Sequence, residues 1–224
     1  MNCCCRVSNI QKYSLLFLLA IFGLALVFGE SILLDFVYPT EQNASSINHP
    51  WFEINTTIDT GNFSEFILNW NGSNTSYTNA SPEISSYNSS RYLFYKNISG
   101  LSEGTYTYYA WANDTDNNLT QTDERIVTID LTAPTLTNLA LNDTSPLAAG
   151  NVTFTLDFSE EMNVSVSPIV KIQNTSEYTI TATGWSNSTR WVGWYNFTIS
   201  TGDGNYTINV TGAEDLAGNL MVPD

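Results

Sequence analysis

GTYTYYAWANDTDNN, which spans residues 104–118, has a second copy in GNYTINVTGAEDLAGN, which spans residues 204–219. Both copies read Gly-x-Tyr-Thr, continue with alternating apolar and polar residues, and end in Asp-x-x-x-Asn. Alternation is typical of a half-buried β-strand, because successive side chains of a strand point to opposite faces of its sheet. The copies lie about 100 residues apart, which is the length of one small β-sandwich domain. The repeat therefore predicts two such domains in tandem.

The same alternation recurs along most of the chain. In its first half we expect strands at residues 32–37, 51–58, 65–70, 91–98, 105–112 and 125–129. In its second half we expect strands at residues 135–141, 152–158, 169–172, 178–183, 191–199 and 206–211. Turn clusters such as Thr60-Gly61-Asn62 separate these segments. Beyond the N-terminal segment, no stretch has the sustained apolar spacing of a helix, so the predicted fold class is all-β, with antiparallel sandwiches.

The boundary between the two domains is predicted at Asp130-Leu-Thr-Ala-Pro134, where the chain stops and restarts. Pro134 cannot donate to a sheet ladder, so it suits the start of a strand. We therefore expect sandwiches at residues 30–131 and 132–224. After Asn118 the first copy continues through a closing strand at 125–129, whereas only LMVPD follows Asn219. This difference predicts that the second sandwich lacks its last strand, and that the chain is a fragment of a longer repeat protein or receives the strand from a neighbour.

Residues 1–29 have the pattern of a targeting segment. Arg6 and Lys12 precede an apolar run at residues 14–28, and small residues follow near Gly29. The run falls short of the roughly 20 apolar residues that span a bilayer, so a cleaved signal peptide is favoured over a signal anchor. All three cysteines, at positions 3–5, lie in this segment. Their spacing does not suit zinc, and no cysteine remains to form a disulfide within the domains.

The charge balance excludes some partners. Seven Lys and Arg residues stand against 22 Asp and Glu residues, for a formal net charge of −15. Nucleic acids need a basic footprint for their phosphates, and anionic membrane surfaces attract basic segments. We therefore expect no nucleic-acid partner.

Asn-x-Ser/Thr triplets are far more frequent than composition predicts. Chance would give about five or six, because Ser and Thr together make up roughly a fifth of the chain. Eighteen are present, starting at Asn43, Asn55, Asn62, Asn71, Asn74, Asn79, Asn88, Asn97, Asn113, Asn118, Asn142, Asn151, Asn163, Asn174, Asn187, Asn196, Asn205 and Asn209. Polar decoration of outward strand positions explains the threonines, but asparagine is depleted in strands. The triplets therefore predict N-glycosylation outside the cytoplasm.

Several motifs carry a family resemblance. Gly-x-Tyr-Thr followed by Ala-x-Asn-Asp resembles the late strand pair of fibronectin type III and related immunoglobulin-like modules. The second copy, with Phe158-Ser-Glu-Glu-Met162 and Glu214-Asp-Leu-Ala-Gly-Asn219, resembles bacterial immunoglobulin-like domains of prokaryotic surface proteins. The resemblance implies tandem sandwiches that act as stalks and display an adhesive tip. With dense glycosylation triplets and no cysteine in its domains, the chain is most similar to an archaeal envelope protein.

Catalysis has few candidate residues. His49 is the one histidine, and no nearby acid is positioned to orient it for a Ser-His-Asp site. Glu160 and Glu161 are adjacent, so on a strand they would point to opposite faces and could not flank a glycosidic bond. We therefore expect no enzyme activity and no catalytic residue.

Calcium is the one cofactor that we weigh. Asp114, Asp116 and Asn118 offer oxygens at alternate positions, and Asp130 at the domain junction could add another ligand. Asp and Asn are also the ordinary residues of a tight turn, where their side chains bond to their own backbone. The turn is the favoured interpretation, so we expect no cofactor, with calcium as the alternative.

Three tryptophans suggest a sugar site or a core. Trp185, Trp191 and Trp194 could stack on pyranose rings, but residues 191 and 194 lie on opposite faces of a strand, so at least one should be core. The favoured function is a non-catalytic, extracellular cell-surface glycoprotein that serves as stalk, envelope or adhesion module. The alternative is a carbohydrate-binding or accessory module of a secreted multidomain enzyme. The expected partners are other cell-surface proteins or glycans and neighbouring immunoglobulin-like domains of a longer chain.

Overall fold

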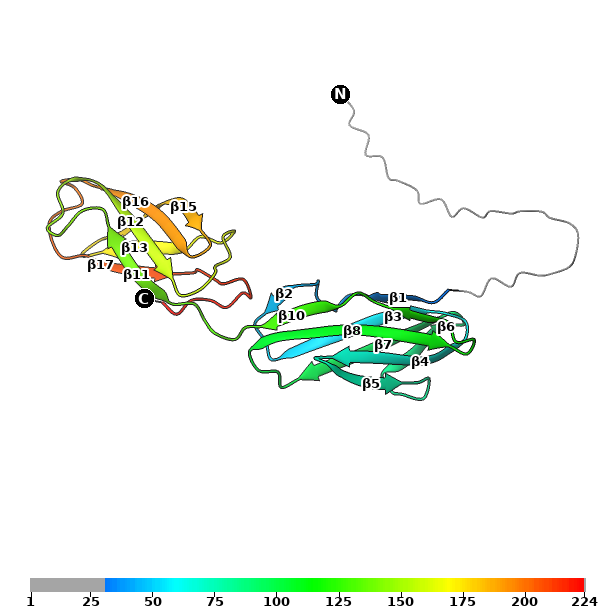
Figure 1. Cartoon of the computed structure of the whole chain (residues 1–224). Coiled ribbons are helices and arrows are strands. Elements are labelled where there is room, and N and C mark those ends of the chain that lie inside the picture. Colours follow the sequence, from blue (N-terminus) through cyan, green and yellow to red (C-terminus); the bar gives the residue numbers. More distant parts are fainter. Residues whose placement is uncertain (1–30, 224) are drawn as a thin grey trace, which may run out of the picture.

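The computed structural model describes residues 31–223 and has the predicted all-β fold. The predicted leader at residues 1–29, with its three cysteines, lies outside the described residues. Figure 1 shows two β-sandwiches that lie end to end and are joined by a short connection. Within the described range, no helix is long and apolar enough to cross a membrane.

The first sandwich consists of two facing sheets. One sheet has the order β1 (Leu33–Phe36), β3 (Trp51–Asp59), β7 (Arg91–Ser99) and β6 (Ile84–Asn88). The other has the order β2 (Ser45–Ile47), β10 (Arg125–Ile129), β8 (Gly104–Asp114), β4 (Phe63–Trp70) and β5 (Ser73–Tyr77), and β9 (Leu119–Gln121) also pairs with β8. All pairs are antiparallel except β2 with β10, which is parallel. This strand order defines an immunoglobulin-like sandwich.

The second sandwich repeats this plan with fewer strands. One sheet has the order β11 (Leu136–Leu141), β12 (Gly150–Phe158), β16 (Arg190–Phe197) and β15 (Thr181–Asn187). The other has the order β14 (Glu177–Thr179), β13 (Ile169–Gln173) and β17 (Thr207–Thr211). Among the described residues, no strand pairs with the outer edge of β17, where the first sandwich has β10 beside β8.

Each sandwich has its own hydrophobic core, built by strand alternation. Along β3 every second residue from Phe52 to Ile58 is buried, and along β12 every second residue from Val152 to Phe158 is buried. The two clusters share no residue. Trp191 on β16 is the largest fully buried side chain of the second core, with 1% of its surface exposed. The prediction that at least one of the three clustered tryptophans is core is therefore correct.

The predicted strand at residues 178–183 is wrong in one respect. The structure divides this segment between β14, which pairs with β13, and β15, which pairs with β16 in the opposite sheet. The buried Ile180 lies between the two strands, so the chain changes sheet at this residue. Four further strands, β2, β5, β6 and β9, were not predicted from the alternation.

Candidate functional site

The Asp-x-x-x-Asn motif forms the same hydrogen-bonded loop in both sandwiches. In the first, Oδ1 of Asp114 accepts the backbone N–H groups of Asp116 and Asn118, each at 2.9 Å, and Oδ2 accepts Nδ2 of Asn118 at 2.8 Å. In the second, Asp215 accepts N–H groups from Ala217 at 2.8 Å and from Asn219 at 2.9 Å, and Nδ2 of Asn219 at 2.8 Å. The Asp114 segment is therefore a turn, as the favoured interpretation of the sequence predicts.

These hydrogen bonds stabilise the ionised form of Asp114. The side-chain amide of Asn118 is the largest cause that holds the pKa of Asp114 below its ordinary value, and backbone N–H groups of Asn118 and Asp116 act in the same direction. Both oxygens of this carboxylate are thus engaged by the protein itself. Asp116 is exposed, and Asp114 and Asp116 belong to no cluster of three acidic side chains within residues 31–223.

The loop of the second sandwich also contacts the junction between the domains. Nδ2 of Asn219 donates to the backbone oxygen of Asp130 at 2.9 Å, in addition to its bond with Asp215. Nδ2 of Asn48, on the first sandwich, donates to the backbone oxygen of Gly218 at 3.1 Å. The connection itself is held by Glu103, whose carboxylate accepts the backbone N–H of Leu131 at 2.9 Å. The junction is therefore hydrogen-bonded from both sides.

Three carboxylates converge at this junction, and we name Asp130, Glu160 and Asp215 the acidic trio. One oxygen of each lies within 4.8 Å of the others, which is the spacing of oxygen ligands around a calcium ion. The trio is the one such group among residues 31–223. Asp215 is 1% exposed and lies in the loop after β17, while Glu160 lies in the loop after β12.

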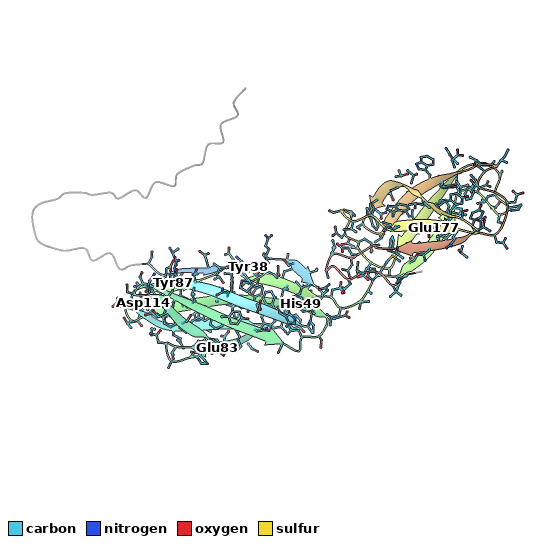
Figure 2. The ribbon with its side chains drawn as sticks, turned by 180° about the vertical axis from the view of Figure 1, so that it is seen from behind. Tyr38, His49, Glu83, Tyr87, Asp114 and Glu177 are labelled. Atoms are coloured by element: carbon cyan, nitrogen blue, oxygen red, sulfur yellow. The ribbon has the colours of Figure 1, made fainter. Side chains whose placement is uncertain are left out.

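One member of the trio, Asp130, is a residue that the sequence analysis considers as an additional calcium ligand beside Asp114 and Asp116. Figure 2 shows Asp114 at the end of the first sandwich that lies away from the second. The repeat itself contained the missing information. Asp215 is the counterpart of Asp114, and in the second sandwich this loop lies at the end that faces the junction.

The pKa of Glu160 is raised where the three carboxylates converge. Burial is the largest cause that raises the pKa of Glu160, and the nearby charges of Asp130 and Asp215 raise it further. A raised pKa in the folded state means that the contribution of Glu160 to stability is complete below its unfolded pKa of about 4.3 and is lost as the pH rises through the folded value.

We therefore expect Glu160→Gln to raise the melting temperature of the second sandwich at pH 7 by about 1–4 °C in the presence of a chelator. At pH 4 the difference should vanish. Thermal unfolding at the two pH values checks this, with the adjacent and exposed Glu161→Gln as the control. Equal melting temperatures for the two variants at pH 7 would contradict it. Repeating the comparison with calcium in place of the chelator shows whether the trio also holds a cation.

The residues weighed for catalysis are engaged otherwise. The ring of His49 stacks on Trp51, with centroids 3.8 Å apart, and Nδ1 lies 2.8 Å from the backbone oxygen of the same tryptophan. Among the described residues, this is the hydrogen bond that the imidazole makes. A general base needs its second nitrogen oriented by an acid, and this arrangement does not supply one.

The glycosylation triplets all lie at the surface. None of their eighteen asparagines is buried, and those within the long strands occupy outward positions, as Asn55, Asn97 and Asn196 illustrate. By contrast, Asn69, which does not begin a triplet, is buried with 5% of its surface exposed. Each triplet asparagine therefore keeps part of its surface in contact with solvent.

Three triplet asparagines also use Nδ2 within the fold. Asn55 donates to the backbone oxygen of Tyr38 at 2.9 Å, Asn118 donates to Asp114, and Asn163 donates to Oε1 of Glu214 at 2.8 Å. All three asparagines are half-buried, and the acceptor of the last two is a carboxylate. A sugar at either position would replace one of two amide hydrogens beside a carboxylate acceptor.

A cleft of about 810 Å³ opens beside β17. Its walls include Leu141, Phe154 and Ile208, together with the chain from 202 to 206. In the first sandwich the corresponding place is filled by β10, whose buried Val127 and Ile129 lie opposite Tyr106 and Gly104. Among residues 31–223, no strand pairs with the edge of β17 beside which the cleft lies.

The matches of this chain to known proteins are to solved structures only. No family model matches the sequence, and no curated protein matches it. Among solved structures, the fibronectin(III)-like modules of Clostridium thermocellum CbhA are similar at 15% identity, over 86% of this chain and 90% of that chain, with a TM-score of 0.43. The D00-D0 domain of intimin is similar at 13% identity, over 85% and 98%, with a TM-score of 0.34. Dimeric latent PorU from Porphyromonas gingivalis is similar at 13% identity, over 86% and 19%, with a TM-score of 0.36. The strand order of this chain itself defines its class: a tandem immunoglobulin-like β-sandwich protein.

Proposed function

We propose that the chain is a non-catalytic glycoprotein of the cell exterior, in which tandem sandwiches serve as a stalk, envelope or adhesion module. The observation that carries this proposal is the surface position of all eighteen triplet asparagines. An attached glycan requires a surface position, and each of these asparagines has one. The density of triplets, with no cysteine after residue 5, supports an archaeal envelope as the setting.

Glycans would protect the places where a sandwich is most vulnerable. Edge strands expose unpaired N–H and C=O groups that template aggregation. Of the eight strands that end the four sheet orders, seven have a triplet asparagine within the strand or no more than three residues from it: Asn43 near β2, Asn74 on β5, Asn88 on β6, Asn142 near β11, Asn174 near β14, Asn187 on β15 and Asn209 on β17. Bulky hydrophilic sugars at these positions would block edge-to-edge pairing and access by proteases.

The junction supports a spacer role. The two sandwiches lie end to end, and side chains from both sides hydrogen-bond to the connection between them (Figure 1). A stalk needs length and resistance to bending at its joints. Asn48, Asn219 and Glu103 provide contacts of this kind at the joint.

Peptide mapping of protein purified from its native cells tests the proposal. We expect glycans on most of the eighteen triplets, with the outward strand positions occupied and Asn118 bare, because its amide is held by Asp114. We also expect the mature chain to begin after residue 29. Protein found in the cytosol with its leader intact and no attached sugar would overturn the proposal.

A carbohydrate-binding or accessory module of a secreted multidomain enzyme is the alternative function. Trp194 favours it, because this indole lies on the outer face of β16 and is 40% exposed. However, Asn196 lies two residues further along the same face, and Asn151 lies directly opposite Asn196 on β12. An external sugar would have to compete there with glycans of the chain itself.

A further inference from the structure

An aromatic residue precedes several triplet asparagines by two positions. Nine of these asparagines lie within strands, and an aromatic content of 13% predicts about one such pair among them. Four pairs are present: Tyr95 with Asn97, Trp111 with Asn113, Trp185 with Asn187, and Trp194 with Asn196. Aromatic residues are enriched in strands, which accounts for part of this excess, so the surroundings of each pair decide what it does.

Three of the four aromatic side chains point outward with their asparagine. Tyr95 is 45% exposed and Trp194 is 40% exposed, and both lie on the same face as the asparagine that follows. Trp111 lies on the outer face of β8 between two buried alanines. Residues two apart on a strand are separated by about 7 Å along one face, which places the ring within reach of a sugar attached to Nδ2.

Trp185 is the exception and serves as an internal comparison. Its ring packs against Phe158, with centroids 5.4 Å apart, and its Nε1 donates to the backbone oxygen of Val166 at 2.9 Å. An irregularity in the strand pairing separates it from Asn187, so the two side chains do not share a face. The sequence spacing is the same as in the other pairs, but the geometry differs.

We propose that Trp194 and Tyr95 are docking faces for the first pyranose of the chain's own glycans, on Asn196 and Asn97 respectively. One face of a pyranose presents C–H groups, and these suit the negative face of an aromatic ring. Docking also removes apolar ring surface from water. This inference rests on the proposed function, because it requires the glycans to be present.

The surroundings of the rings agree with this role. The hydroxyl of Tyr95 donates to the carboxylate of Glu53 on the neighbouring strand, which fixes the ring over the sheet. Asn55 lies directly opposite Tyr95, so two triplets flank this ring. Trp111 is the weakest of the three, because it stacks on Tyr109 at 5.5 Å and Oδ1 of Asn113 is buried.

A double-mutant cycle on the full glycosylated chain tests the proposal. The four proteins are the wild type, Trp194→Ala, Asn196→Gln and the double variant, each followed by thermal unfolding. We expect Trp194→Ala to lower the melting temperature of the second sandwich by about 3–5 °C when Asn196 carries its glycan, and by about 1 °C or less in the Asn196→Gln background. The corresponding cycle at Trp185 and Asn187 should show additive effects, because that ring faces the core.

Mass spectrometry of the same samples distinguishes a failure of the docking proposal from a failure of the proposed function. A glycan on Asn196 with no coupling to Trp194 would overturn the docking face and leave the proposed function standing. A wild-type chain with no sugar on any triplet would overturn both. Coupling of the same size at residues 185 and 187 would also count against the proposal, because it would show that a shared outer face is not required.

Discussion

Replacement of Gly193 with alanine is expected to destabilise the second sandwich by about 2–3 kcal/mol. A Cβ atom built at this position would lie 2.3 Å from Cη2 of Trp191, 2.7 Å from its Cζ3, and 2.8 Å from Cγ2 of Ile180. These are core atoms, because Trp191 and Ile180 are buried. The ring cannot retreat, since a packed core has few voids and an indole is rigid. The cost is therefore steric and does not come from the backbone conformation.

Thermal and chemical unfolding of the Gly193→Ala variant measure this cost, with tryptophan fluorescence to follow the second core. A matched rescue tests the cause. Trp191→Phe alone should destabilise by leaving a cavity, but combined with Gly193→Ala it should cost less than the sum of the two single variants, because the smaller ring makes room for the methyl group. A Gly193→Ala protein as stable as the wild type, or strict additivity in the double variant, would contradict the steric explanation.

Trp191 and Gly193 illustrate what the sequence can predict and what it cannot. Alternation along β16 shows that Trp191 and Gly193 share one face and Trp194 the other, and the structure has Trp191 in the core and Trp194 outside. The reason for the glycine is not visible in the sequence. It depends on which way the indole turns and on Ile180, which reaches the same space from the segment between β14 and β15. The periodicity of the sequence predicts the strand face on which a residue lies, but only the packed structure shows which side chains that residue contacts.

Two of the four strands missing from the sequence prediction share a physical feature. β5 and β6 lie at sheet edges, and each has one buried apolar residue, Tyr77 and Ile84 respectively. Their remaining residues are mainly Ser, Thr and Asn, so no alternation is available to detect. Such strands are specified by pairing with the neighbouring strand and not by their own burial pattern. The segment around Ile180 failed for a related reason, because alternation does not say which of two facing sheets a strand joins.

The junction could be predicted only in part. A restart near Pro134 was evident, and Asp130 was identified as a possible ligand. Convergence of Asp130 with Glu160 and Asp215 depends on three loops that meet at one end of the second sandwich. Sequence distance between them is large, so only the topology brings them together. The repeated Asp-x-x-x-Asn motif was the one available signal, and it identified Asp215 as the counterpart of a residue already considered.

Replacement of the aspartate in each repeated loop by asparagine gives the second large effect that we expect. The carboxylate of Asp215 accepts three N–H groups on its two oxygens, whereas an asparagine offers a single acceptor oxygen and would turn an amide nitrogen toward Nδ2 of Asn219. Loss of hydrogen bonds to a buried charge predicts a destabilisation of about 2 kcal/mol for Asp215→Asn. Relief of repulsion with Asp130 and Glu160 should offset part of it.

Asp114→Asn isolates the loop itself, because Asp114 lies outside the acidic trio. We expect it to lower the melting temperature of the first sandwich, and Asp116→Asn, in the same loop but with an exposed side chain, to leave it nearly unchanged. The pH dependence provides a second check. Because the pKa of Asp114 is lowered in the folded state, its contribution is complete above the unfolded value of about 3.9 and is lost as the pH falls through the folded value.

The difference between the wild type and Asp114→Asn should therefore be largest near neutral pH and should shrink in strong acid. The opposite trend would show that the carboxylate does not act through its charge. Equal effects of Asp114→Asn and Asp116→Asn would show that the loop does not depend on the hydrogen bonds of its first aspartate. Each loop variant should unfold its own sandwich and leave the other intact. That result would show that the same aspartate hydrogen bonds stabilise each copy of the repeat, and that each sandwich is stable independently of its neighbour.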